Sequence, residues 1–160
     1  MKLFYTLFLF TLIPFFIKAQ STTSFSEYPL PQFSILLTDS ATTYTKASLP
    51  KGKQVLVVLF SPDCDHCKKE VESIKKNIKD FKNTQVIMVT SQPFSKMKAF
   101  YREFELAKFK EITVGWDPRF FFPNYYKIKF FPFLAIYDKK YKYLKHFEGN
   151  PQWADLKAYL

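Results

Sequence analysis

The fold of this 160-residue chain is decided by one stretch, in which a buried strand leads into two cysteines: Val55-Leu56-Val57-Val58-Leu59-Phe60-Ser61-Pro62-Asp63-Cys64-Asp65-His66-Cys67. Its first six residues are apolar and rich in valine, which is typical of a fully buried strand. Beyond Cys67, apolar residues recur at helical spacing, which predicts an amphipathic helix with one face on a core. The apolar positions are Val71, Ile74, Ile78 and Phe81. The two thiols should therefore lie where a strand turns into a helix.

The rest of the chain alternates between strand and helix patterns. A hairpin is predicted from strands 32–37 and 42–49, followed by a strand over 54–60 and a helix over 68–81. Further strands are predicted over 85–90, 112–116, 130–138 and 143–147, and helical segments over 95–106, from 117 onward, and over 151–160. Strands that alternate with helices indicate an α/β domain, with parallel strands in its sheet and helices on both faces.

Three polar residues are predicted to cap helices. Ser95 stands at the start of the second helix, and Asp117 precedes a proline at the start of the third. Asn150 precedes Pro151 at the start of the last helix. Ser, Asp and Asn are favoured at this position because their side chains accept hydrogen bonds from unpaired backbone N–H groups, and proline fits the first turn.

The N-terminus has the pattern of a secretory signal peptide. Met1-Lys2 is followed by an apolar run from Leu3 to Ile17 and then by Lys18-Ala19. We predict a signal peptide over 1–19, a linker over 20–31 and one domain over 32–160. The run is shorter than the roughly 20 residues that span a bilayer, although an uncleaved membrane anchor is the alternative. Either way, the domain is expected outside the cytoplasm, in the periplasm or secreted.

Composition excludes several function classes. The formal net charge is +10, but the lysines are spread along the whole chain and no nucleic-acid-binding module is recognisable. We interpret the charge as a solvated surface, with weak contact to a membrane surface or an acidic partner as the alternative. Only three glycines occur, and no glycine-rich phosphate loop is found. We expect no nucleic acid partner and a monomeric protein.

The two cysteines, Cys64 and Cys67, favour redox chemistry over the alternatives. A disulfide between them would close a very small loop and add little stability. A zinc site needs about four ligands, and Cys64, Cys67 and His66 supply three at most, with His146 the only other histidine. Two inert thiols would oxidise outside the cytoplasm. We therefore predict a redox dithiol that needs no metal and no cofactor.

The position of each thiol suggests its role. A thiol at a helix N-terminus lies near the positive end of the helix dipole, which favours the thiolate that attacks disulfides. Cys64 is nearer to that end and is predicted to be exposed and nucleophilic. Cys67, one turn farther on, is predicted to be more buried and to resolve the mixed disulfide.

The strand Val55 to Phe60, followed by Ser61 to Glu70, resembles the active-site region of thioredoxin-fold proteins. The signal peptide, the N-terminal hairpin and the Cys-Lys-Lys-Glu run are most similar to the extracytoplasmic, TlpA/ResA-like branch of redoxins. The resemblance covers about residues 30 to 160. It implies a thioredoxin fold, with a central mixed sheet flanked by helices and an extra N-terminal β-hairpin.

The resemblance also implies roles for residues beyond the dithiol. Pro132 matches the family's cis-proline, which faces the dithiol, and Phe131 would supply the backbone that pairs with substrate. Glu70 matches a helix glutamate that tunes the second thiol; a solvated helix acid is the alternative. Pro62 and His66, which flank the thiols, complete the set expected to contact substrate.

Some positions depart from the family pattern. Asp63 replaces the usual tryptophan, Val58 replaces a buried acid, and Phe131 is bulkier than the usual residue before the proline. Ser61 fits the peroxidase pattern P-x-x-x-[ST]-x-x-C, but Val57 occupies its proline position.

The residues around Cys64 indicate no single redox direction. The carboxylates of Asp63 and Asp65 disfavour a neighbouring thiolate. His66 resembles the histidine of the oxidant DsbA type, where it stabilises the thiolate, but a plain exposed polar residue is the alternative.

We predict a secreted or envelope thiol–disulfide oxidoreductase that exchanges disulfides with cysteine-containing envelope proteins and with a membrane or envelope redox partner. Glu70 and the branch resemblance favour a reductase. One alternative is a thiol peroxidase of the peroxiredoxin-like type. Another is a redox-inactive binding domain that uses the aromatic surface around Phe120-Phe121-Phe122 and Tyr125-Tyr126.

Overall fold

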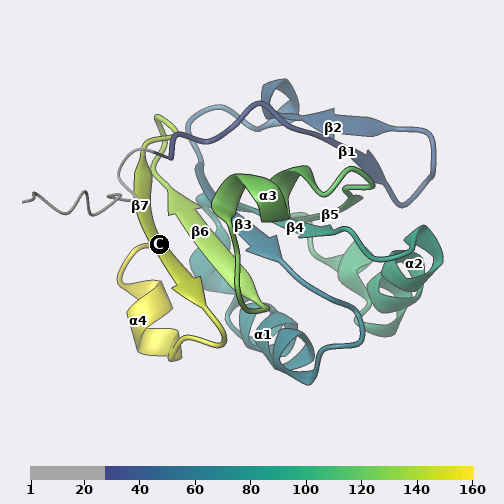
Figure 1. Cartoon of the computed structure of the whole chain (residues 1–160). Helices are drawn as coiled ribbons and strands as arrows, with labels where there is room; N and C mark the ends of the chain where they lie inside the picture. Colours follow the sequence, from purple (N-terminus) through teal and green to yellow (C-terminus); the bar gives the residue numbers. More distant parts are fainter. Residues whose placement is uncertain (1–27) are drawn as a thin grey trace, which may run out of the picture.

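A computed structural model describes residues 28–160 (Figure 1). The predicted signal peptide and residues 20–27 of the predicted linker lie outside the described residues. The strands are β1 Ser34–Leu37, β2 Thr43–Thr45, β3 Gln54–Leu59, β4 Thr84–Thr90, β5 Ile112–Trp116, β6 Phe133–Tyr137 and β7 Tyr143–Glu148. The α-helices are α1 Asp65–Lys76, α2 Phe94–Glu103, α3 Phe121–Tyr126 and α4 Trp153–Lys157. Short 3-10 turns are η2 Lys46–Ser48, η3 Ile78–Phe81 and η4 Leu106–Lys108.

The strands form one mixed seven-stranded sheet in the order β2-β1-β5-β4-β3-β6-β7. β3 pairs in parallel with β4, and β4 pairs in parallel with β5. β6 runs antiparallel to β3, and the hairpin β1-β2 joins the edge of the sheet antiparallel to β5. β3 therefore lies inside the sheet, and the chain leaves its carboxyl end directly into the cysteine segment.

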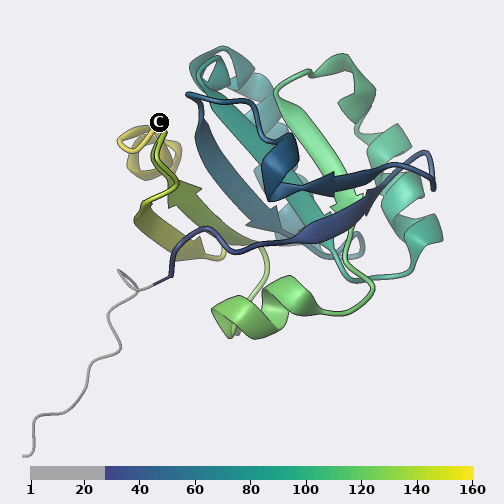
Figure 2. The ribbon, with the colours of Figure 1, turned by 90° about the horizontal axis from the view of Figure 1, so that it is seen from above.

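Each face of the sheet covers its own hydrophobic core. The helices α1, α2 and α4 cover one face, where Val71, Met97 and Leu156 pack against alternate sheet residues. The helix α3 and the segment before β1 cover the other face, with Phe122 and Tyr126 against the sheet. Figure 2 shows α3 on the opposite side of the sheet from α1 and α2. This is the two-sided α/β arrangement that the sequence predicts.

The predicted order of elements is confirmed, with differences at their ends. The second hairpin strand stops at Thr45, because the chain turns into η2 instead of remaining extended to 49. The helix predicted over 68–81 begins earlier, at Asp65, and ends at Lys76, with η3 as a separate turn. Leu30 is buried, so close packing already begins within the last residues of the predicted linker.

Two of the three predicted helix caps are wrong, and the third acts differently. Pro93, not Ser95, is the N-cap of α2, and Gln152, not Asn150, is the N-cap of α4. The helix α3 begins after Phe120, three residues later than a cap at Asp117 would place it. The buried Asp117 carboxylate nevertheless accepts a hydrogen bond from the Phe122 N–H at 2.9 Å, so it satisfies a free donor of that helix.

Candidate redox site

The two thiols occupy the junction of β3 and α1, as predicted. Cys64 is the N-cap residue of α1 and is partly exposed, whereas Cys67 lies in the first turn and is 1% exposed. The Cys64 N–H donates to the Ser61 carbonyl at 3.1 Å, which closes the turn before the helix. Both cysteines are free thiols. One thiol is therefore within reach of a partner, and the other is accessible only from within the protein.

Several groups act on the buried thiol. Burial raises the pKa of Cys67 far above its usual range, because a thiolate there loses its hydration. A hydrogen bond with the Ser61 backbone opposes this rise in the pKa, while contact with Cys64 and the negative charge of Glu70 add to it. Cys67 is therefore a protonated thiol at neutral pH and needs a proton acceptor before it can attack.

Glu70 lies one turn after Cys67 on the same face of α1 and is 2% exposed. The structure therefore excludes the alternative of a solvated helix acid. Burial raises the pKa of Glu70, and a hydrogen bond from Asn150 opposes that rise. A carboxyl group whose pKa is raised in this way is a better proton acceptor than an exposed one.

Asn150 connects the segments around Glu70, although the sequence suggested only a cap role for it. Its Nδ2 donates to Glu70 Oε2 at 3.0 Å and to the His66 carbonyl at 2.8 Å. Its Oδ1 lies 3.0 Å from His66 Nδ1. Asn150 lies 80 positions after Glu70 and 84 positions after His66 in the sequence, so no local sequence pattern could have revealed these contacts.

Pro132 lies at the same edge of the sheet as the dithiol. The Phe131–Pro132 peptide bond is cis, as the resemblance implied. Because Phe133 pairs with Leu59 at the end of β3, Pro132 lies beside the start of the cysteine segment. The Pro132 carbonyl accepts a hydrogen bond from the Gly149 N–H at 2.8 Å. Phe131 is partly buried and packs against the core cluster that also contacts Cys64.

The residues that flank the thiols fall into a buried and an exposed group. Pro62 is buried, whereas Asp63, Asp65 and His66 are exposed. Asp63 forms an ion pair with Lys96 of α2, so its negative charge beside Cys64 is partly compensated. Val58, at the position where the resemblance would place a buried acid, is buried among apolar side chains.

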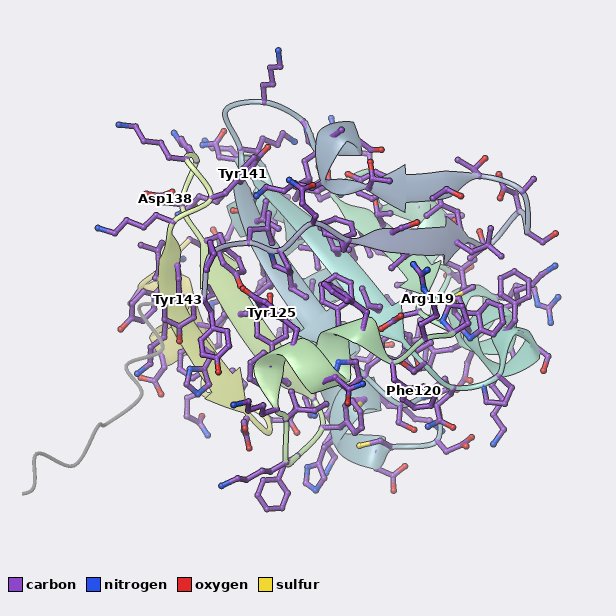
Figure 3. All side chains as sticks on the ribbon, turned by 45° about the horizontal axis from the view of Figure 1, so that its top comes forward. Arg119, Phe120, Tyr125, Asp138, Tyr141 and Tyr143 are labelled. Atoms are coloured by element: carbon purple, nitrogen blue, oxygen red, sulfur yellow. The ribbon has the colours of Figure 1, made fainter. Side chains whose placement is uncertain are left out.

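The residues of the predicted aromatic surface point to different sides of α3, so some are buried and others are exposed. Phe122 and Tyr126, four residues apart, are buried against the sheet. Phe120 and Phe121 stay exposed, and the Tyr125 hydroxyl donates to the Pro29 carbonyl at 2.6 Å. Figure 3 shows Arg119 and Phe120 at the start of α3 and Tyr125 farther along the helix. Only part of this cluster is therefore available to a partner.

Residues 28–160 contain neither a metal-binding cluster nor a membrane-spanning helix. No group of three or more His, Cys, Asp or Glu side chains in this part of the chain is placed to hold a metal ion. No helix in the same part is long and apolar enough to cross a membrane.

Comparison with known proteins identifies the family. The sequence profile of the AhpC/TSA family matches residues 27–151. The chain belongs to the AhpC/TSA family. Among curated protein sequences, none matches this chain significantly.

Solved structures show the same fold. A candidate thioredoxin from Neisseria meningitidis is 26% identical with a TM-score of 0.67, and the alignment covers 80% of this chain and 84% of that one. A candidate protein disulfide isomerase from Bacteroides thetaiotaomicron is 25% identical with a TM-score of 0.67, covering 81% and 84%. A secreted disulfide oxidoreductase from Mycobacterium tuberculosis, 18% identical with a TM-score of 0.65 over 79% and 92%, shares the fold.

These findings confirm the thioredoxin fold and the resemblance to redoxins. Family, fold and the Cys64–Cys67 pair together identify this AhpC/TSA member as a thiol–disulfide oxidoreductase.

Proposed function

We propose that this protein reduces disulfides in cysteine-containing proteins outside the cytoplasm and is itself reduced again by an envelope or membrane redox partner. One observation carries the proposal. Cys64 is partly exposed at the N-terminus of α1, and the buried Cys67 lies beside it, with the buried carboxyl group of Glu70 one helical turn farther on. This arrangement separates a thiol that meets the partner from a thiol that completes the exchange.

In the first step, the Cys64 thiolate attacks one sulfur of the partner's disulfide. A bond forms between Cys64 and that sulfur, the partner's S–S bond breaks, and the other partner sulfur leaves as a thiolate that takes a proton from solvent. The N-terminus of α1 supplies the positive end of the helix dipole at the position where the Cys64 sulfur carries negative charge.

In the second step, Cys67 attacks Cys64. Glu70 accepts the Cys67 proton, the Cys64–Cys67 bond forms, and the bond from Cys64 to the partner breaks. The second partner sulfur leaves as a thiolate and takes a proton from solvent, and Glu70 later returns its proton to solvent. Over the two steps the partner disulfide gains two electrons and the dithiol loses two. Burial raises the pKa of Glu70, which makes its carboxylate a better acceptor for the Cys67 proton than an exposed carboxylate would be.

The surface near Pro132 is suited to hold the partner. Within residues 28–160, no hydrogen bond occupies the Phe131 main chain, so it can pair with an extended segment of the partner. Phe130, 66% exposed, and Phe120, 51% exposed, are apolar groups that a partner can cover. Pro62 is buried and His66 is exposed, so we propose that Pro62 shapes the loop before Cys64 and that His66 contacts the docked segment.

The buried thiol favours a reductant. A dithiol is oxidising when its reduced form is specially stabilised. Here burial and the charge of Glu70 disfavour the Cys67 thiolate. We expect a reduction potential nearer to thioredoxin's, about −270 mV, than to DsbA's, about −120 mV, by equilibration with glutathione. A potential near the DsbA value would reverse the proposed direction.

Reduction of insulin disulfides by the purified domain tests the proposed activity. Wild type should accelerate the reaction with dithiothreitol as electron donor, and Cys64→Ser should reduce the rate to that of the donor alone. Equal inactivity of both proteins across several donors would contradict the proposal and favour a redox-inactive binding domain.

Peroxide reduction is a second candidate, because Ser61 and Cys64 fit part of the peroxidase pattern and the chain belongs to the AhpC/TSA family. Val57, at the proline position of that pattern, pairs with Ile87 and Ala135 in the middle of the sheet. Proline in such a place would remove a ladder hydrogen bond, so the proline of the peroxidase pattern does not fit this position. Hydrogen peroxide turnover that survives Cys67→Ala would favour the peroxidase.

A further inference from the structure

Asn150 reaches the redox site from the segment between β7 and α4. Glu148 ends β7 opposite Phe133, and the Gly149 N–H is bonded to the Pro132 carbonyl. Asn150 is therefore fixed beside the cis-proline on one side and beside the first turn of α1 on the other. Its outer side is exposed, but its amide points inward to Glu70.

All hydrogen-bonding groups of the Asn150 amide nitrogen are in use. An amide nitrogen has two N–H donors, and these serve Glu70 Oε2 and the His66 carbonyl. The amide oxygen faces His66 Nδ1, which must carry a proton to donate to it. Rotation of the amide would lose the bond to the His66 carbonyl, so the observed orientation is the one with every group satisfied.

This orientation distinguishes between the two states of Glu70. An ionised carboxylate accepts the Asn150 N–H, whereas a protonated carboxyl would offer an O–H at the same place. The amide donor therefore favours the ionised form, against the burial that disfavours it. Without the donor, Glu70 would stay protonated to a higher pH.

We infer that Asn150 is a positioning residue of the exchange reaction, which holds Glu70 in the ionised, proton-accepting state beside Cys67 and links it to His66. The inference rests on the proposed role of Glu70 in the second step of exchange. Titratable side chains lie on both sides of this network: Cys67, whose pKa is raised by Glu70 and by Cys64, and His66, which contacts the Asn150 amide.

The second step can be observed alone. Reduced protein mixed with dithiobis(nitrobenzoate), an aromatic disulfide, releases a first coloured thiolate when Cys64 attacks. It releases a second one when Cys67 displaces the aromatic thiol from Cys64. The rate of the second phase does not depend on reagent concentration, and its acid limb reports the group that accepts the Cys67 proton.

Asn150→Ala should move this acid limb upward by roughly one to two pH units, since a hydrogen bond to a charged group is worth about 1.5 to 3 kcal/mol and one pKa unit about 1.36. Asn150→Asp keeps the size but places a second carboxylate beside Glu70, so it should move the limb farther. Asn83→Ala, an exposed asparagine beyond the other end of the sheet, is the matched control and should leave the profile unchanged.

Variants that also change Glu70 separate a role of Asn150 that acts through Glu70 from a purely structural role. In Glu70→Gln the limb should be lost, and adding Asn150→Ala should then change nothing in its pH dependence. An Asn150→Ala profile that superimposes on wild type, or one that shifts equally with and without Glu70, would overturn the inference. Insulin reduction by wild type, measured in parallel, reports separately on the proposed function. Failure there with an intact Asn150 shift would leave the inference standing.

Discussion

Each face of the sheet buries a pair of titratable side chains, and the two pairs differ in what surrounds them. On the face covered by α1, the pair is Cys67 and Glu70; on the face covered by α3, it is Tyr126 and Tyr137. All four side chains are at most 2% exposed, and burial raises the pKa of all four. Burial and a raised pKa therefore do not by themselves mark a reactive site.

The difference lies in the hydrogen bonds and in access to the surface. The hydroxyls of Tyr126 and Tyr137 are 2.6 Å apart and satisfy one another, and the Tyr126 ring packs on Phe133. Cys67 instead borders a partly exposed thiol, and the hydrogen-bond donor for Glu70 comes from a surface loop. A buried titratable group can take part in a reaction when it contacts a group that a partner can reach.

The largest expected effect is the loss of exchange when the exposed thiol is removed. Cys64→Ser should abolish insulin reduction because a hydroxyl does not attack disulfides, whereas Tyr126→Phe should keep the wild-type rate. The rates of both variants, measured beside circular dichroism of the folded state, check the contrast between the faces. Loss of activity in a folded Tyr126→Phe would show that the second face also takes part.

Removing the Tyr126 hydroxyl should lower stability, although it should leave activity unchanged. Tyr126→Phe leaves the buried Tyr137 hydroxyl without its partner, so we expect a loss of about 1 to 3 kcal/mol in the free energy of unfolding. The double variant Tyr126→Phe with Tyr137→Phe removes both polar groups and should recover much of that loss. Urea unfolding curves measure both values. A double variant that is less stable than either single one would contradict a self-satisfied pair.

The sequence predicted the part of this arrangement that depends on local pattern. Apolar runs and spacing placed both thiols correctly at the end of a buried strand, and the resemblance supplied Pro132. Glu70 stayed ambiguous because charged residues occupy most of the outer helix positions, although its spacing from Cys67 and Ile74 is that of one helix face. In the aromatic cluster, the four-residue spacing of Phe122 and Tyr126 is the sequence signal that separates the buried members from the exposed ones.

The helix caps and the contacts of Asn150 could not be predicted from the sequence, for a physical reason. A cap preference of about 1 kcal/mol is readily outweighed by tertiary contacts. Asn150 binds His66 and Glu70, far away in the chain, and the pairing of β6 with β7 is what carries it there. Such contacts follow from the assembled sheet and not from any stretch of residues.

A smaller effect, confined to a pH window, should distinguish the buried carboxyl. The pKa of Glu70 is raised in the folded state, so its contribution to stability is fully present below the unfolded value, 4.5, and is lost as pH rises through the folded value. Wild type should therefore lose stability relative to Glu70→Gln as pH rises through that window. Unfolding at a series of pH values measures the difference, and parallel curves would contradict it.

The smallest effect should come from the exposed ion pair beside Cys64. Lys96 and Asp63 are 49% and 62% exposed, so Lys96→Ala should change the free energy of unfolding by less than about 1 kcal/mol. It leaves the Asp63 carboxylate uncompensated near the attacking sulfur, so the first phase with the aromatic disulfide should slow modestly at low salt. Added salt should remove the difference, because it screens exposed charges. Lys110→Ala, also exposed but in the turn before β5, serves as control; an equal slowing there would indicate net charge and not the pair.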